Sequence, residues 1–498
     1  MTVSRPNSLM TTMAAVHPIE AFTVPSDAVF KSGCRLEGSF YGSDGYRAAR
    51  AMFHSGFKLE TLGSFAEVRW PGIFARRYVQ DPAVGIPFLT TSDVVEAKPP
   101  HRRYISAALT VGLAGVTVSA GDILVTRSGT VGKVVLCTKN HAGSAVSEDA
   151  LRVLPTSGSI RGLLYCYLQS PAGQFLVVRS KSGSVVEHLY EDDLRDQLIP
   201  VLPLKLRTRL TELVEGMSRL RVEANGLLDE AEGEIQIQCG LPNLSDLEAS
   251  TTSGSLSGAR VFIVRSDEVF GPENQFGAVR LDATYYDPLA ARLREVILGS
   301  GGKQLSGVLR EVRNSGLRKR MYVDDPTVGV PVIGGKQLMQ VRTSDVSYLS
   351  KALTRNLHEE TVRAGWTLVS CGGTLGRTLF VHRNLEGWAV SQHVMRLLPD
   401  ESQVWPGYLY AFVASPYGQI QVAQRAYGSV IPELRDFQFA SIAIAVPPDR
   451  GRAIHNVVVR AFDCRADALA LENEAIRLFE AAIEEGRDAT EEKWGREY

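Results

Sequence analysis

Three loops of this chain carry basic residues beside aromatic and amide side chains, the residue types that bind phosphate groups and base edges. Each loop has a counterpart later in the chain. The first holds Arg69, Arg76, Arg77 and Tyr78, and its counterpart holds Arg313, Arg318, Lys319, Arg320 and Tyr322. The second sets Thr91 and Ser92 against Lys336 and Gln337, and the third sets Lys181 and Ser182 against Arg425 and Tyr427. Arginines present at both places suit phosphate contacts, which any DNA sequence offers, whereas residues that differ suit base reading. The alternative is that each loop is an ordinary solvated surface.

Residues 121–133 (GDILVTRSGTVGK) are glycine-rich, as a phosphate-binding loop would be. A P-loop reads G-x-x-x-x-G-K-[ST], but Arg127 stands five residues before Gly132, and Val134 follows Lys133. The stretch returns at 365–377 as GWTLVSCGGTLGR. We therefore predict a tight strand connection, in which Thr130 and Thr374 bond locally to the turn. Lys133 and Arg377 are candidates for an additional phosphate contact.

Catalytic patterns are nearly absent from the chain. Asp81, Glu96 and Lys98 fit the loosely spaced acids of a nuclease, but the second copy has Gln340 and Arg342 where Glu96 and Lys98 stand. The six cysteines are scattered singly, without metal-ligand spacing to the nine histidines. We predict no catalytic residue, no metal and no cofactor of its own, and keep a metal-dependent nuclease as an alternative.

Composition bounds the class of protein. A chain of 498 residues suggests several domains, and a net charge of -1 gives no bulk attraction to nucleic acid, so DNA binding would need local basic patches or a partner. Unpaired cysteines and the lack of an apolar run long enough to span a bilayer predict a reduced, cytoplasmic protein without a membrane segment.

An internal duplication runs through the whole chain. FTVPSDAVF (22–30) returns as FIVRSDEVF (262–270), RLEGSFY (35–41) as RLDATYY (280–286), and residues 67–87 align without a gap with 311–331 at an offset of 244 residues. Later, SPAGQ (170–174) meets SPYGQ (415–419), and the GSV at 183–185 meets the GSV at 428–430. Short β-branched runs broken by Gly and Pro, with one helical stretch near 163–178, predict a β-rich α+β domain in each copy.

A long helix is predicted after each domain. Apolar residues alternate at steps of three and four, which is the a/d seam of a coiled coil. The first seam is Leu206, Leu210, Leu213, Met217, Leu220, Ala224, Leu227 and Ala231. The second is Ile454, Val457, Ala461, Cys464, Ala468, Leu471, Ala475, Leu478 and Ala482. At about 1.5 Å per residue, each rod would be about 50 Å long. The alternative is that each helix packs only on its own domain.

These twinned stretches, with the helix after each domain, resemble the specificity subunit of type I restriction-modification systems over nearly the whole chain. Trp366 in place of Asp122 and Cys371 opposite Arg127 are local departures. The resemblance implies two pseudo-twofold-related target-recognition domains, separated by two long antiparallel coiled-coil helices, each reading half of a bipartite asymmetric DNA site. The repeat, the helical spacing and the Ser/Gly/Thr-rich composition predict a leader (1–21), domains at 22–203 and 262–447, helices at 204–240 and 448–498 (with a tail), and a flexible linker at 241–261.

The resemblance also implies partners. They are double-stranded DNA, two adenine methyltransferase subunits that use S-adenosylmethionine, and restriction/translocase subunits that use ATP and Mg²⁺. A second hypothesis is a non-catalytic scaffold that uses the duplicated modules on protein partners. If the helices act as a ruler, deleting residues 212–218 should shift the preferred spacer and leave both half-sites unchanged.

Overall fold

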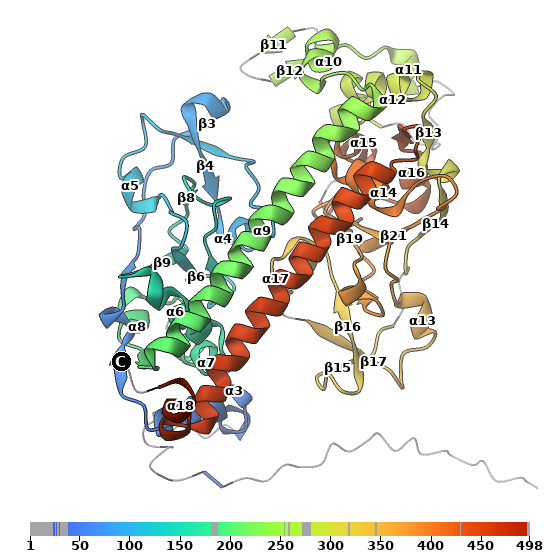
Figure 1. Ribbon diagram of the computed structural model, residues 1–498. Helices are drawn as coiled ribbons and strands as arrows, with labels where there is room; N and C mark the ends of the chain where they lie inside the picture. Colours follow the sequence, from blue (N-terminus) through green and yellow to red (C-terminus); the bar gives the residue numbers. More distant parts are fainter. Residues whose placement is uncertain are drawn as a thin grey trace, which may run out of the picture.

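Two domains lie on either side of a pair of long helices in the computed structural model (Figure 1). The structure describes residues 23–24, 26, 29, 38–180, 188–252, 254–256, 259–270, 280–316, 319–343, 346–428 and 430–495. The predicted leader, residues 1–21, lies outside these ranges. Both domains mix small sheets with helices, so the predicted α+β class is confirmed.

Domain 1 contains two four-stranded sheets. The first runs in the order β2-β9-β6-β7 (Ala66–Arg69, Ala150–Pro155, Ile123–Thr126, Val134–Leu136) and is antiparallel. The second runs β3-β5-β4-β8 (Tyr78–Val79, Tyr104–Ser106, Gly85–Leu89, Ala145–Val146), with β4 and β8 parallel. A small β1-β10 sheet (Leu59–Thr61, Leu198–Pro200) and helices α3, α6 and α7 (Asp44–His54, Arg161–Gln169, Pro171–Ser180) complete the domain.

Domain 2 repeats this topology strand for strand. Its sheets run β14-β21-β18-β19 (Leu309–Arg313, Val394–Pro399, Thr367–Ser370, Thr378–Phe380) and β15-β17-β16-β20 (Tyr322–Val323, Ser347–Ser350, Gly329–Ile333, Ala389–Val390). The β13-β22 sheet (Lys303–Gln304, Ala443–Ile444) and helices α12, α14 and α15 (Pro288–Gly299, Pro406–Ala414, Pro416–Arg425) follow. Register is kept as well: Arg69 lies opposite Arg152, and Arg313 lies opposite Arg396. The two copies therefore share one fold.

The twinned glycine stretches turn the chain between β6 and β7 and between β18 and β19. Gly132 and Gly376 have φ of +91° and +80°, a region that other residues rarely adopt. A hydroxyl closes each turn, but it belongs to the last strand residue and not to Thr130 or Thr374. Thr126 Oγ1 accepts a hydrogen bond from the Lys133 amide at 2.9 Å, and Ser370 Oγ accepts one from Arg377 at 2.9 Å.

The stretch near 163–178, predicted as one helix, forms two helices that meet at the SP-x-GQ motif. Pro171 begins α7 immediately after α6 ends at Gln169, so the helical stretch predicted near 163–178 is broken there. Gln174 Nε2 donates to the carbonyls of Gly132 at 3.0 Å and Leu168 at 2.6 Å. Gln419 makes the equivalent bonds to Gly376 and Val413 in domain 2. The motif thus ties the bent helix pair to the glycine turn in both copies.

Gly173→Ala should destabilise the protein, because a Cβ at this glycine of the motif would lie only 1.9 Å from the Tyr167 carbonyl oxygen. We expect a loss of about 1–3 kcal/mol, the usual cost of overpacking. Gly233→Ala is the control, since a Cβ at this exposed helical glycine would meet nothing within 4 Å. The control should gain about 0.5–1 kcal/mol. Urea unfolding midpoints test both, and equal midpoints would contradict the close approach at Gly173.

Helices α9 (Leu204–Cys239) and α17 (Arg452–Glu485) pack against each other along their length (Figure 1). Arg209 near the start of α9 pairs with Glu474 near the end of α17 at 2.9 Å, while Glu223, further along α9, pairs with Arg460. The helices are therefore antiparallel, as predicted. Their seam includes the buried Ala224, Leu227, Ala461 and Cys464, which confirms the coiled-coil prediction.

Each long helix also contacts both domains. Helix α6 of domain 1 packs on both α9 and α17, and helix α14 of domain 2 does the same. The alternative that each helix packs only on its own domain is therefore wrong. Leu213 and Met217 of α9 share a core with domain 1, whereas Ala231 and Ile235 share one with domain 2. The attachment point of each domain along the rods is fixed by these buried contacts.

The segment predicted to be a flexible linker, 241–261, is partly helical. Leu244–Thr251 forms α10, and Leu247 is buried where α10 packs on α12. Asn243 caps this helix by accepting a hydrogen bond from the Ser245 amide at 2.8 Å. The Ser/Thr-rich composition concealed an amphipathic turn with a good N-cap. At the other end of the chain, α18 (Arg487–Trp494) follows α17, and the Arg487 amide donates to Ser55 of domain 1 at 2.8 Å.

Candidate nucleic-acid interface

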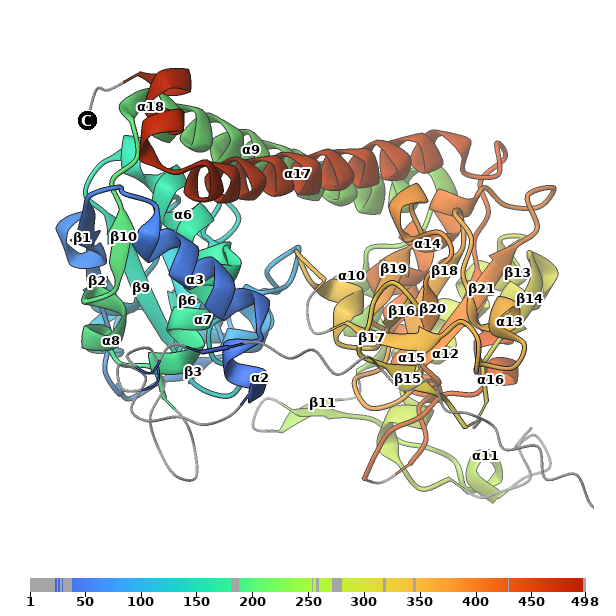
Figure 2. The same ribbon diagram turned by 90° about the horizontal axis from the view of Figure 1, so that it is seen from below.

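Each domain presents a tip where its second sheet ends in loops. We call these surfaces tip 1 (residues 77, 78, 84, 109 and 111) and tip 2 (residues 319, 322, 328, 353 and 355). Backbone hydrogen bonds join their loops: Ser106 donates to Arg77 and Ala107 to Val84, and Ser350 and Lys351 make the equivalent bonds to Met321 and Val328. Strands β3 and β15, which carry Tyr78 and Tyr322, lie on the side of the molecule away from α9 and α17 (Figure 2).

Some tip residues are retained in both copies. Tyr78 and Tyr322 are equivalent and are 54% and 52% exposed, and Leu109 and Leu353 are equivalent and are 68% and 63% exposed. Exposed aromatic and aliphatic side chains at the same place in both domains give the tips a common shape. Common shape suits contacts that any DNA site can provide, such as the deoxyribose sugars of the backbone.

Other tip residues differ sharply between the copies, and the sequence argument missed them. Val111 and Gly112 of domain 1 correspond to Arg355 and Asn356 of domain 2, and all four are exposed. Gly112 and Asn356 both adopt positive φ, 80° and 54°, so the backbone is the same while the side chains change. In tip 2 a cleft of about 430 Å³ is lined by Lys319, Arg320, Thr354, Arg355, Asn356, Glu359 and Glu360. Aligning 104–122 with 348–366 at the offset of 244 would have revealed this contrast.

Two of the arginines predicted to contact phosphate are already held by carboxylates. Arg76 pairs with Glu148 and lies over the Phe88 ring, and Arg320 pairs with Glu360 at 3.1 Å. Burial opposes the charge on Arg76, but its hydrogen bond and ion pair with Glu148 outweigh burial and raise the pKa of the guanidinium. Arg320 and Glu360 are both nearly inaccessible, with side chains 9% and 5% exposed. Arg320 is therefore mostly enclosed within tip 2, with its charge already paired.

Arg69 and Arg313 are more accessible, but each is also paired with an acid two residues earlier. Arg69 hydrogen-bonds Glu67, and Arg313 hydrogen-bonds Glu311 at 2.7 Å while lying over the Trp366 ring. The hydrogen bond from Arg69 lowers the pKa of the Glu67 carboxyl. By contrast, Arg77 and Lys319 are exposed at the tips. We expect phosphate contacts from Arg77, which follows Arg76, and from Lys319, which precedes Arg320.

The structure describes only the domain 2 residues of the third predicted loop. Arg425 is 9% exposed, and its guanidinium hydrogen-bonds Ser441 Oγ at 2.8 Å, while burial lowers its pKa to about 10. Its guanidinium is therefore enclosed within domain 2. Tyr427 is half-buried and bonded to Glu433 and Arg435. Lys181 and Ser182, and also Arg318 of the first loop, lie outside the described residues.

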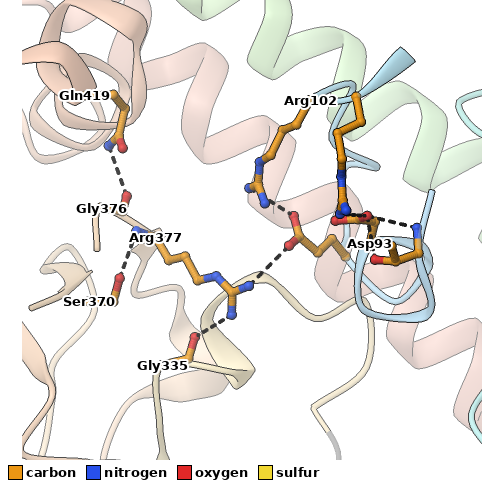
Figure 3. Close-up of polar contacts among 10 residues, drawn as sticks. Asp93, Arg102, Gly335, Ser370, Gly376, Arg377 and Gln419 are labelled. Atoms are coloured by element: carbon orange, nitrogen blue, oxygen red, sulfur yellow. Dashed lines mark hydrogen bonds and ion pairs between the residues drawn. The ribbon is translucent and has the colours of Figure 1, made fainter. Parts of the chain in front are cut away.

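The remaining predicted residues meet at the centre of the molecule, between the domains. Thr91, Ser92, Lys133, Lys336 and Arg377 line a cavity of about 650 Å³ that also includes Arg221 and Arg342, with Glu96 and Glu472 as its acids. Gln337 is close by and accepts a hydrogen bond from the Gly334 amide through Oε1 at 3.1 Å. Arg377 crosses from domain 2 to lie 3.6 Å from Glu96 of domain 1 (Figure 3).

The three residues of the nuclease alternative are engaged in different places. Asp81 Oδ1 accepts from the Ala83 amide at 2.9 Å, Glu96 is buried between the domains, and Lys98 pairs with Asp229 of α9. Among the described residues, no three His, Cys, Asp or Glu side chains are grouped so as to hold a metal ion. Within the same part of the chain, no helix has the length and apolarity needed to cross a membrane.

No protein-family model and no curated protein sequence matches the chain. Among solved structures, the S subunit of a type I restriction-modification system from M. genitalium is similar at 11% identity and a TM-score of 0.30, covering 86% of this chain and 95% of that one. The HsdS subunit from Thermoanaerobacter tengcongensis is similar at 15% identity and a TM-score of 0.26, covering 87% and 96%.

A third structure, from a study of assembly and conformational transition of the type I R-M system, is similar at 14% identity and a TM-score of 0.26, covering 87% of this chain and 97% of that one. These TM-scores are too low for the likeness to carry a function.

Proposed function

We propose that the chain is the sequence-specific DNA recognition subunit of a type I restriction-modification complex. In this proposal each tip reads one half of a bipartite site, and the α9–α17 pair sets the unread gap between the halves. The observation that carries it is that two domains of one fold, both attached to one pair of helices, present different side chains at equivalent positions, such as Val111 and Arg355. Because the tips differ, the site should be asymmetric.

Partner subunits would carry out the methylation and cleavage of DNA. We propose that two adenine methyltransferase subunits, with S-adenosylmethionine, and restriction/translocase subunits, with ATP and Mg²⁺, assemble on this non-catalytic chain in the cytoplasm. The net charge of -1 is consistent with a subunit that needs partners to hold DNA, since it provides no bulk attraction. Mapping methylated adenines genome-wide in cells with and without the chain tests the proposal. A two-part motif that disappears with the chain supports it, and an unchanged methylation pattern contradicts it.

Arg355→Val should weaken discrimination at one half-site only. Arg355 is exposed in the tip 2 cleft, where an arginine can bond a base edge, and valine is the residue that domain 1 carries there. Loss of one good base contact should reduce preference for the correct base by roughly 5–150-fold. The measurement is competition binding of the assembled complex to DNA libraries randomised in each half-site.

Arg292→Ala is the matched control for this variant. Arg292 lies on α12 and is also an exposed arginine, paired with Glu295 at 2.9 Å. Arg292→Ala should leave the base preference at both half-sites unchanged. Equal effects of Arg355→Val on both half-sites, or no effect on either, would exclude tip 2 from base reading.

A protein-binding scaffold is favoured by one observation, the retention of exposed Leu109 and Leu353 in both copies. Duplicated apolar side chains suit two copies of the same protein partner. Leu109→Ser together with Leu353→Ser separates the two functions. Loss of a co-purifying protein with DNA binding intact would favour the scaffold, whereas weakened DNA binding with the partners retained would favour the recognition subunit.

A further inference from the structure

The two domains touch each other directly through a short two-stranded contact, which we call the interdomain strap (residues 95–98 of domain 1 and 339–342 of domain 2). The Ala97 amide donates to the Met339 carbonyl at 2.6 Å, and the Val341 amide donates to the Val95 carbonyl at 2.9 Å. Glu96 and Gln340 face each other as an antiparallel bridge. These two residues occupy equivalent positions at the offset of 244, so the pseudo-twofold axis of the protein passes through the strap.

The strap is also tied to both long helices. Asn225 of α9, which is buried, donates from Nδ2 to the Ala97 carbonyl at 2.9 Å and accepts from Arg465 of α17 at 3.2 Å. Lys98 pairs with Asp229 of α9, and Arg342 lies 3.7 Å from Glu472 of α17. The strap therefore lies against the middle of the helix pair and is held by both rods.

An ion cluster crosses the boundary beside the strap. The Glu96 carboxylate, 3% exposed, lies 3.6 Å from Arg102 of its own domain and 3.6 Å from Arg377 of domain 2 (Figure 3). Arg377 also donates to the Gly335 carbonyl at 3.3 Å. Burial raises the pKa of Glu96, and the two arginines oppose that rise. A buried carboxylate needs its cations, so separating the domains would leave Glu96 with only its intradomain partner.

We infer that the strap, together with the helices, fixes the distance and twist between the two domains and so determines which spacer length the protein accepts. This inference rests on the proposed function. Contacts along one rod pair leave each domain able to rock about its attachment. A second contact beside the rods, on the pseudo-twofold axis, removes that freedom. The strap residues would then be specificity-determining without touching a base.

The test compares two arginines that lie equally far from one carboxylate. Arg377→Gln removes the interdomain ion pair, and Arg102→Gln, the control, removes only the intradomain one. Val341→Pro, made separately, deletes the amide that donates to Val95. The first readout needs no DNA: the distance distribution between labels on unnatural amino acids at positions 109 and 353 of the full chain. The second is binding of the assembled complex to sites with spacers lengthened or shortened by one base pair.

Arg377→Gln and Val341→Pro should broaden the distance distribution and reduce discrimination against the wrong spacer by roughly tenfold. That factor is of the order given by losing one hydrogen bond, as in Val341→Pro, or one buried ion pair, as in Arg377→Gln. The base preferences at both half-sites should stay as in the wild type. The Arg102→Gln control should keep the wild-type distance distribution and spacer discrimination. A distribution as narrow as that of the wild type in both strap variants overturns the inference, and so does unchanged spacer discrimination. If the wild-type complex reads no bipartite site, the proposed function fails, and the label distances alone then decide whether the strap fixes the domains.

Discussion

Duplicating one heptad in each long helix should lengthen the preferred spacer by about three base pairs and leave both half-sites unchanged. The duplicated segments are 218–224 of α9 and 464–470 of α17, which face each other near the middle of the helix pair. Ala468 in the second segment belongs to the core shared with domain 1, and the duplication keeps a copy of it beside that core. Seven residues add about 10 Å to a helix. That length corresponds to about three base pairs of B-DNA at roughly 3.4 Å each along a strand. Because a whole heptad repeats, the a/d seam stays in phase.

Selection of bound or methylated sites from a library of spacer lengths measures this result. Duplication in α9 alone is the control, because one lengthened rod cannot stay paired with an unaltered partner, and it should reduce binding at every spacer. The lengthened pair must also separate the interdomain strap, so it should tolerate neighbouring spacers more readily than the wild type. Retention of the original spacer in a folded double duplication would contradict the role of the helices in measuring distance.

The deletion of 212–218, suggested by the sequence alone, is a poorer test. This stretch includes Leu213, Val214 and Met217, which belong to the core shared by α9 and domain 1. Removing it would take away the attachment of that domain as well as shorten the rod. We expect loss of stability and not a clean shift of spacer. Heptads near the middle of the helix pair, where the seam includes Ala224 and Cys464, are therefore the better place to change the length of the rods.

Glu472→Ala should cost about 3–5 kcal/mol, the usual effect of breaking a buried ion pair. Glu472 of α17 is 1% exposed, and its carboxylate lies 2.8 Å from Arg221 of α9 and 3.7 Å from Arg342 of domain 2. The Tyr165 hydroxyl of domain 1 also donates to it. One side chain thus joins both helices and both domains. Burial opposes the charge on Arg221, but the pairing with Glu472 outweighs it and raises the pKa of the guanidinium.

Glu474→Ala is the matched control for this variant. Glu474 lies two residues further along α17 and pairs with Arg209 at 2.9 Å, but both side chains are about two-fifths exposed. An exposed pair of this kind should contribute at most about 1 kcal/mol. Thermal and urea midpoints of the full chain compare the two variants. Joint replacement of Glu472 by Leu and Arg221 by Met should recover much of the loss, because no unpaired charge then remains buried.

Local patterns in the sequence determined the repeated fold and the helix pair. Colinear matches at an offset of 244 predicted that the domains at 22–203 and 262–447 would fold alike. The steps of three and four through Ala224 and Ala461 predicted two paired helices. Both features depend on residues close together in the chain, or on the copies being compared with each other. The glycine turns were predictable for the same reason, since positive φ is a property of a single residue.

Only the tertiary structure decided which charged side chains are accessible and which are buried and paired inside the protein. Arg320 and Arg425 look like surface arginines in the sequence, but Glu360 and Ser441, 40 and 16 residues further along the chain, hold them in the interior. The strap could not be predicted from the sequence either, because Glu96 and Arg377 are 281 positions apart and no local pattern indicates that they pair. Pairing of buried charges depends on which segments the fold brings together, and a pattern read along one chain does not contain that information.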